Sequence, residues 1–206
     1  LKFLKGTPVR EKYVQYGFVF DKVAPYQIIK SNYLSEQELA QIVKLEHALE
    51  IYWNKKRAIN TLKYVTNKHG IFDFLLGLGT YFGTKHDYHK YTLSNIYEVL
   101  YEFADKSYPD DDVLKQLIAI DYYLEHKVKP KVLFFKEITH EEKIHNTENG
   151  NFNHRKFRNV ILPLSFDFNL FKEKGIIEIS DNKLILQYTG VDHPEVLQSR
   201  SVLNAN

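Results

Sequence analysis

The chain has 206 residues, of which 44% are hydrophobic, enough to bury a core in one large domain or two small ones. Its 28 basic and 26 acidic residues leave a net charge of +2, which gives no reason to expect nucleic acid as a partner. Without cysteine, the chain itself can form no disulfide and no cysteine-ligated iron–sulfur cluster. No apolar run approaches the roughly 20 residues of a membrane span and no signal peptide is recognisable, so we expect a cytoplasmic protein without membrane contact.

Residues 1–33 predict a strand, a helix and a second strand, followed by a linker. The apolar run at residues 1–4 suits a buried strand. Thr7 can cap a helix whose first residue is Pro8, and Gly17 can end it in a left-handed conformation. The predicted helix therefore covers residues 8–16. Extended chain is expected after it, over residues 18–20 and 23–29.

Residues 34–145 predict a helical domain. Ser35 and Glu38 form a capping box, the strongest helix start in the sequence, and this helix should continue to about Trp53. Its expected inward stripe is Leu39, Ile42, Leu45, Leu49, Tyr52 and Trp53. A second helix should follow, with Ile59, Leu62 and Val65 inward, and should end at Gly70. Further helices are expected over residues 93–106 and 111–126, and after a capping box at residues 139–142.

Residues 71–82 are apolar on nearly every side of a helix but too few to cross a membrane. This pattern predicts either burial all round or docking against another domain. Gly77, Gly79 and Gly83 are one residue off the dinucleotide-binding fingerprint and follow no predicted strand. Close packing between helices is therefore the better interpretation of these glycines.

The remaining residues, 146–206, predict a polar loop, a small antiparallel sheet and a tail. Strands are expected at residues 160–168, 176–179 and 184–188, with residues 180–183 as the turn of a hairpin. Pro163 confines its strand to an edge or a bulge, because it has no N–H to donate. The fold class is thus α+β, with a mostly helical middle, short strands at the N-terminus and a small antiparallel sheet at the C-terminus.

Two histidine pairs are candidates for metal or acid–base sites. His86 and His89 stand three residues apart in a predicted loop, but no third ligand is identifiable. His140 and His145 are one residue too far apart for the helical zinc motif, so that spacing puts the imidazoles on different faces. We therefore assign no metal ligand and no catalytic residue.

A set of polar and aromatic residues near the first helical junction and in the fifth helix is not explained by the predicted core. A buried Arg57 paired with Asp121 would hold helices together, the preferred interpretation, or would clamp an anionic group of a substrate. The candidate substrate-binding residues are Tyr26, Tyr52, Asn54, Arg57, Asp121 and Tyr122.

Several segments carry a family resemblance. They are Leu-Lys-Phe-Leu-Lys-Gly-Thr-Pro at residues 1–8, Tyr16-Gly17, Pro25-Tyr26, Tyr52-Trp53-Asn54 with Arg57, and Ile120-Asp121-Tyr122. In this order they resemble the C-terminal region, a domain of unknown function, of B12-binding-domain-containing radical SAM proteins. Those proteins are Fe–S oxidoreductases, some described as magnesium-protoporphyrin IX monomethyl ester oxidative cyclases. In that family Gly-Thr-Pro follows the last strand of the radical SAM barrel.

The resemblance implies a longer parent enzyme, an oxidoreductase or a methyltransferase or cyclase, with a [4Fe-4S] cluster, S-adenosylmethionine and cobalamin bound by upstream domains of the same chain. The three cysteines that would hold the cluster are absent, since this sequence has no cysteine. Residues 1–33 would then be a residual edge of the barrel and a linker. The rest of the chain would close the barrel and shape the substrate pocket, and the chain would be inactive alone. The alternatives are an independent protein-interaction or small-ligand binding module, and a hydrolase that uses His86 and His89.

Overall fold

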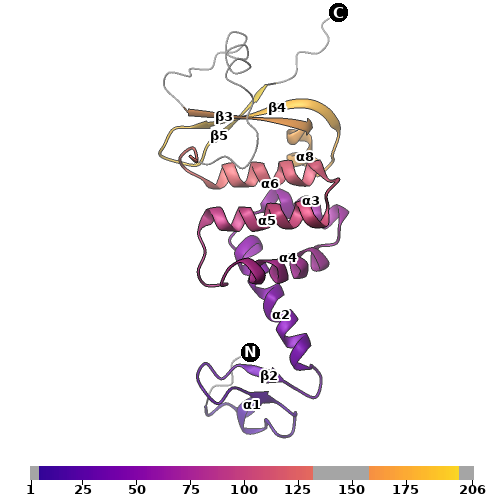
Figure 1. The fold of residues 1–206 in the computed structure, drawn as a ribbon, viewed down its shortest axis with the longest axis vertical. Helices are drawn as coiled ribbons and strands as arrows, with labels where there is room; N and C mark the ends of the chain where they lie inside the picture. Colours follow the sequence, from indigo (N-terminus) through magenta and orange to yellow (C-terminus); the bar gives the residue numbers. More distant parts are fainter. Residues whose placement is uncertain (1–4, 132–157, 200–206) are drawn as a thin grey trace, which may run out of the picture.

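The computed structural model describes residues 5–131 and 158–199. In Figure 1 a small N-terminal unit lies at one end, and a long helix, α2 (Glu36–Ala48), joins it to stacked helices that end in a sheet. The predicted α+β class is confirmed. The predictions for residues 1–4, 139–142, 146–156 and 200–206, and for His140 and His145, lie outside the described residues.

The N-terminal unit contains a short helix and a two-stranded antiparallel sheet. These elements are α1 (Pro8–Glu11), β1 (Val19–Phe20) and β2 (Ile28–Lys30). The predicted helix over residues 8–16 is wrong in length, because turns replace helix after Glu11. Gly17 does adopt the predicted left-handed conformation, with φ of 61°. A Cβ at this position would collide with the side chain of Asn32, so glycine is required.

The capping box at the start of α2 is confirmed. Ser35 Oγ accepts from the Glu38 amide at 3.2 Å, and the Glu38 carboxylate accepts from the Ser35 amide at 2.8 Å. A π-helix, η1 (Leu49–Asn54), then widens the spiral. The predicted inward stripe is confirmed at Tyr52, which is fully buried, but is wrong at Trp53, because it assumed an unbroken 3.6-residue period. Ile51, outside the predicted stripe, is buried, whereas Trp53 is half exposed. Ile42, within α2, was predicted to face inward and is exposed.

Helix α3 (Ile59–Lys68) and helix α4 (Ile71–Lys85) follow. Leu62 and Val65 are buried as predicted, but Ile59 is exposed. Burial of α4 on all sides is not observed, since Phe74, Leu75, Leu78 and Phe82 face the core while Phe72 is 60% exposed. Close packing at Gly79 is confirmed, because a Cβ there would overlap the backbone carbonyl of Lys44 in α2.

Helices α5 (Leu93–Ser107) and α6 (Asp112–Glu125) match their predicted spans within two residues. Both begin with a side-chain cap: Thr92 accepts from the Asn95 amide, and Asp111 accepts from the Leu114 amide. Packed between α5 and the sheet, α6 buries eight of its residues (Figure 1). It is therefore the central helix of the molecule.

The C-terminal sheet has the order β3-β4-β5 and is antiparallel throughout, with strands β3 (Arg158–Phe166), β4 (Ile179–Tyr188) and β5 (Glu195–Ser199). The predicted hairpin at residues 180–183 is wrong, because Asn182 and Lys183 are paired within β4 opposite Leu164 and Pro163. Pro163 does lie in an edge strand, as predicted. The sequence prediction missed β5 and helix α8 (Phe168–Lys174), which is capped by Asp167.

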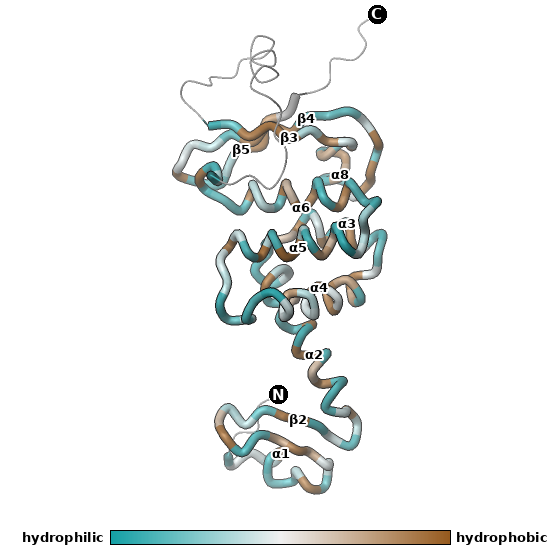
Figure 2. Tube along the Cα trace, in the orientation of Figure 1, coloured by the Kyte–Doolittle hydropathy of each residue, from teal (hydrophilic) through white to brown (hydrophobic). Residues whose placement is uncertain are grey.

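The main core is one large apolar cluster that runs from η1 through the helices to the sheet, and Ile161 and Ile185 form a smaller one. Figure 2 shows that hydrophobic residues recur along these helices and strands. Polar contacts join its layers: Tyr188 Oη donates to the Tyr123 carbonyl at 2.7 Å, and the Ser165 amide donates to Gln116 Oε1 at 2.9 Å. The helices and the sheet therefore form one continuous folded body.

Candidate functional site

The link between η1 and α3 has an unusual backbone. The π-helix ends at Asn54, and the Tyr52 carbonyl then accepts from the amides of both Arg57 and Ala58, at 3.2 and 3.3 Å. Lys56 has a φ of 55°, a conformation that is costly for a residue with a Cβ. Both π-helices and left-handed non-glycine residues are more frequent at functional sites than elsewhere.

Asp121 of α6 fixes the first residues of α3. Its Oδ1 accepts from the Asn60 amide at 3.2 Å and from Asn60 Nδ2 at 2.8 Å. Its Oδ2 accepts from the Thr61 amide at 2.8 Å and from Thr61 Oγ1 at 2.7 Å. The carboxyl is almost fully buried, and this desolvation outweighs the four hydrogen bonds and raises the pKa of Asp121 to about 6. Asp121 acts as an N-cap supplied by another helix.

Arg57 does not pair with Asp121, which corrects the predicted ion pair. Its nearest acidic partner is Glu125, with Nε 3.9 Å from Oε1, and its Nη1 atom is buried without a hydrogen-bond partner among the described residues. The reason is that the backbone and side chains of α3 already occupy both oxygens of Asp121. Arg57 therefore keeps a guanidinium nitrogen that no described group satisfies.

Tyr97 of α5 connects the candidate residues, and sequence reasoning missed this role. Its hydroxyl lies 2.6 Å from the Arg57 carbonyl and 3.2 Å from the Asp121 carbonyl. Its ring packs edge-on against Tyr122 at 5.3 Å. Burial, with the nearby negative charge of Asp121, raises the pKa of Tyr97 far above its usual range, so it stays protonated. Only its aromatic character was visible in the sequence.

The other candidates occupy different surroundings. Tyr52 is fully buried and donates to the Ile96 carbonyl at 2.8 Å, whereas Asn54 is exposed and donates to Glu50 at 3.0 Å. Tyr26 belongs to the N-terminal unit, where the Arg10 guanidinium lies 4.5 Å from its ring centre. The structure thus gathers Tyr52, Arg57, Asp121 and Tyr122 around Tyr97, and leaves Tyr26 and Asn54 outside this group.

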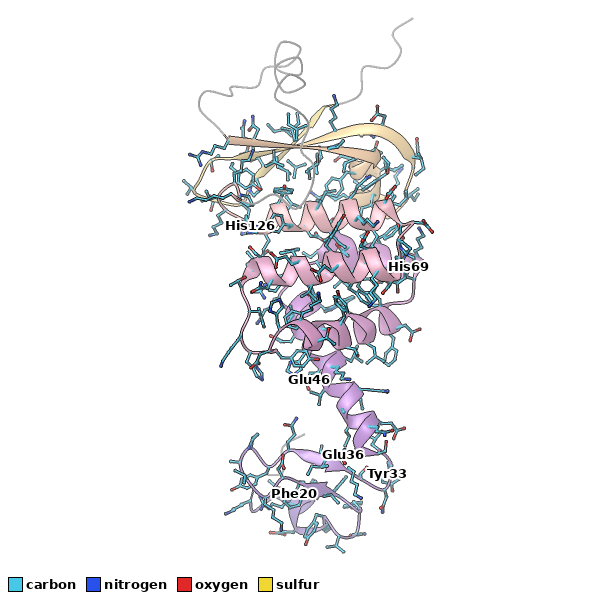
Figure 3. The ribbon with its side chains drawn as sticks, in the orientation of Figure 1. Phe20, Tyr33, Glu36, Glu46, His69 and His126 are labelled. Carbon is cyan, nitrogen blue, oxygen red and sulfur yellow. The ribbon has the colours of Figure 1, made fainter. Side chains whose placement is uncertain are left out.

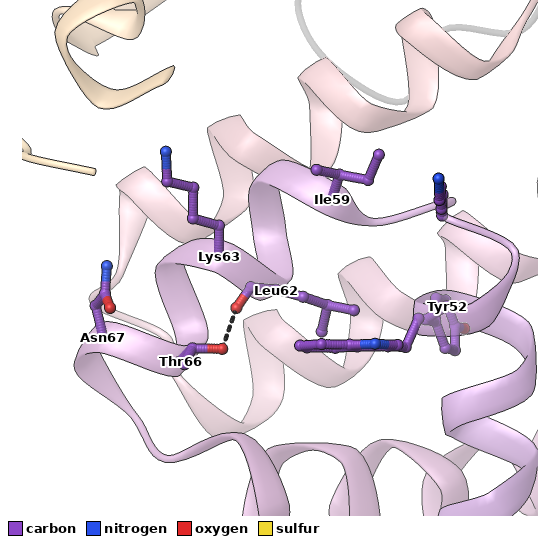
Figure 4. Close-up of a pocket in the computed structure, with 8 residues that line it drawn as sticks. Tyr52, Ile59, Leu62, Lys63, Thr66 and Asn67 are labelled. Carbon is purple, nitrogen blue, oxygen red and sulfur yellow. Dashed lines mark hydrogen bonds between the residues drawn. The ribbon is translucent and has the colours of Figure 1, made fainter. Parts of the chain in front are cut away.

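A pocket of about 570 Å³ lies between the end of η1 and the outer face of α3 (Figure 4). It is lined by Tyr52, Trp53, Lys56, Ile59, Leu62, Lys63, Thr66 and Asn67. Leu62 and Tyr52 are buried core residues, while Trp53 is 48% and Ile59 56% exposed. This size and lining are typical of small-molecule pockets.

A second polar cluster surrounds Asp111 at the start of α6, and the sequence showed it only as a helix start. His69 Nε2 and Lys68 Nζ lie 2.6 and 3.0 Å from Asp111 Oδ2, and Tyr64 Oη donates to Oδ1 at 2.9 Å. Burial raises the pKa of Asp111, but the hydrogen bonds from His69, Leu114, Lys68 and Tyr64 outweigh it, so the pKa is lowered overall. Figure 3 shows His69 beside α5, and the cluster fastens the end of α3 to α6.

The two loop histidines lie in separate contacts. His86 packs against Phe82, with ring centres 5.8 Å apart, and His89 lies edge-on to His47 at 5.5 Å. His47 in turn stacks on Tyr88 at 4.1 Å, and burial lowers its pKa. In the part of the chain that the structure describes, no three His, Asp or Glu side chains are grouped as metal ligands would be.

Residues 14–178 match a family model described as "Protein of unknown function (DUF4080)". The chain belongs to this family. No curated protein and no solved structure matches it. Within the DUF4080 region lie η1, the pocket, Asp111 and Asp121. Over residues 5–131 and 158–199, no helix combines the length and the apolar character of a membrane span.

Proposed function

We propose that this chain is a C-terminal accessory domain of a cobalamin-dependent radical SAM Fe–S oxidoreductase, which closes the open side of the barrel and helps to shape the substrate pocket. Membership of a family of unknown function is compatible with this role, and the resemblance of residues 1–8 to the end of a radical SAM barrel supports it. A cytoplasmic location is part of the proposal.

The apolar surface of the N-terminal unit is the observation that carries the proposal. None of residues 5–47 is fully buried, although the segment is rich in valine, tyrosine and phenylalanine. The exposed fractions of Val14, Val23 and Tyr33 are 73%, 77% and 80%. Figure 3 shows Phe20 and Tyr33 at the end of the molecule opposite the C-terminal sheet, away from its core.

Such a unit gains little stability by itself. A sheet of a two-residue and a three-residue strand needs packing against further structure, and exposed apolar patches of this kind mark contacts with other proteins or domains. In the whole protein, the radical SAM barrel beside this unit would bury its exposed apolar surface. The unit would then align the helical part with the barrel mouth, where water must be excluded from radical chemistry.

The parent cofactors would be held elsewhere. The chain has no cysteine, so it cannot supply the cysteine thiolates that hold a [4Fe-4S] cluster, and the described side chains form no group of metal ligands. The proposal therefore assigns S-adenosylmethionine, cobalamin and the cluster to upstream domains and expects no catalysis from this chain alone.

The first test is the reading frame upstream of Leu1. A three-cysteine cluster motif is expected within roughly 250 residues, the length of one barrel. Absence of such a motif would overturn the proposal.

The second test compares hydrogen exchange in residues 8–30 of this chain, alone and as part of the whole gene product. Slower exchange in the whole protein is expected, because the barrel covers the unit. Val14→Glu and Val23→Glu should abolish that protection, while Lys22→Glu, an exposed charge change in the same unit, should keep it. Equal exchange in the two proteins would contradict docking.

A further inference from the structure

The pocket beside α3 combines an apolar body with uncompensated positive charge. None of its eight lining residues is acidic, and two are lysines. Lys56 forms no ion pair with any described residue, and Lys63 Nζ donates only to the backbone carbonyls of Phe171 and Lys172, at 3.1 and 2.8 Å. A lysine ammonium has three donors, so Lys63 retains one.

The polar and apolar groups are separated along the pocket. Lys63, Thr66 and Asn67 stand three and four residues apart on α3 and therefore share one face, at one end of the view in Figure 4. Thr66 Oγ1 donates its proton to the Leu62 carbonyl at 2.7 Å, so the side-chain donors left at this end are those of Lys63 and Asn67. Tyr52 lies at the other end of the same view, with Leu62 and Ile59 between.

We propose that this pocket binds a small organic acid with a flat, apolar body. The body would lie against Trp53, Ile59 and Leu62, and the acid group would receive hydrogen bonds from Lys63 and Asn67. Charge complementarity selects an anion, because the pocket offers ammonium groups and no carboxylate. This inference goes beyond the proposed docking role, since it concerns a different face of the chain and a different partner.

One feature of the free chain points to an occupied pocket. Trp53 and Ile59 keep about half of their surfaces in water. A ligand in the pocket would cover both side chains.

Trp53 is the single tryptophan of the chain, so its fluorescence reports directly on the pocket. We would titrate the purified chain with 2-naphthoic acid, its neutral amide and the cationic 2-naphthylmethylamine. The acid should quench Trp53 saturably and bind about tenfold more tightly than the amide, the gain expected from a charged hydrogen bond. The amine should bind more weakly still.

Neighbouring lysines provide a matched control. Lys55 is paired with Glu50 at 3.8 Å and does not line the pocket, so Lys55→Gln should bind the acid as the wild type does. Lys63→Gln, which removes the ammonium that would bind the acid group, should weaken acid binding about tenfold and leave amide binding unchanged. Ile59→Glu, at an exposed position, should abolish acid binding while the thermal unfolding midpoint stays unaltered.

Equal affinity for the acid, the amide and the amine would overturn the proposal, as would quenching that survives Ile59→Glu. Absence of saturable quenching by all three probes would also overturn it. None of these results bears on the docking of the N-terminal unit, because hydrogen exchange in residues 8–30 is measured independently.

Discussion

The carboxylate of Asp121 accepts hydrogen bonds from both the amide and the hydroxyl of Thr61, at 2.8 and 2.7 Å, and so fixes the start of α3 against α6. Replacing Asp121 by alanine leaves these buried donors without an acceptor. We expect Asp121→Ala to lower the free energy of unfolding by about 3 kcal/mol in urea titrations at pH 5. Asp110→Ala, at an exposed position before α6, should change it by less than about 0.5 kcal/mol.

The raised pKa of Asp121 also predicts a pH dependence. In the folded chain this pKa is about 6, against about 3.9 when unfolded, so the folded state keeps a proton that the unfolded state loses between these values. Stability therefore falls as pH rises from about 4 to 6, by up to about 3 kcal/mol from this group.

Asp121→Asn has no group to titrate at that position. Chemical unfolding of the wild type and of this variant, measured at several values from pH 4 to 7, isolates the contribution. The stability of the wild type should decline relative to the variant as the pH rises. A constant difference would show that folding does not raise the pKa of Asp121.

Local sequence signals predicted most helices, since their causes lie within a few residues. The capping box of Ser35 and Glu38 needs no distant partner, and the start of α6 needs only Asp111 and its own first turn. The extended course of β4 was not predictable in this way. The local sequence at Ser180 to Lys183 is polar and favours a turn. Pairing with β3 nevertheless keeps this segment in an extended strand.

The candidate site was predictable in part. Tyr52, Arg57, Asp121 and Tyr122 were selected from the sequence and do lie together, but their hydrogen-bond partners were not foreseen. Asp121 binds residues about 60 positions earlier in the chain, and no local pattern encodes that distance. The π-helix likewise moves Trp53 out of the predicted inward stripe, and Trp53 lines the pocket.

Gly79 allows α4 to pack directly on α2. We expect Gly79→Ala to lower the free energy of unfolding by about 2 kcal/mol, because a methyl group there overlaps the rigid Lys44 carbonyl and the helices must separate. Thr80→Ala, the adjacent exposed position, controls for helix propensity and should be neutral or slightly stabilising. Thermal denaturation of both variants checks this, and equal stability of Gly79→Ala and the wild type would contradict close packing.

Asp111 should give the opposite pH dependence to Asp121. Hydrogen bonds from His69, Lys68 and Tyr64 make its pKa lower in the folded than in the unfolded chain, although burial acts against them. Its ionised form therefore stabilises the fold above about pH 4, and that contribution is lost as the pH falls further.

Asp111→Asn removes the charge at every pH. We expect the stability difference between the wild type and this variant to be largest near pH 6 and to shrink towards pH 2, measured by urea unfolding. Asp181→Asn, an exposed position in β4, should show no such trend, and a pH-independent loss in Asp111→Asn would mean that Asp111 acts through hydrogen-bond geometry and not through its charge.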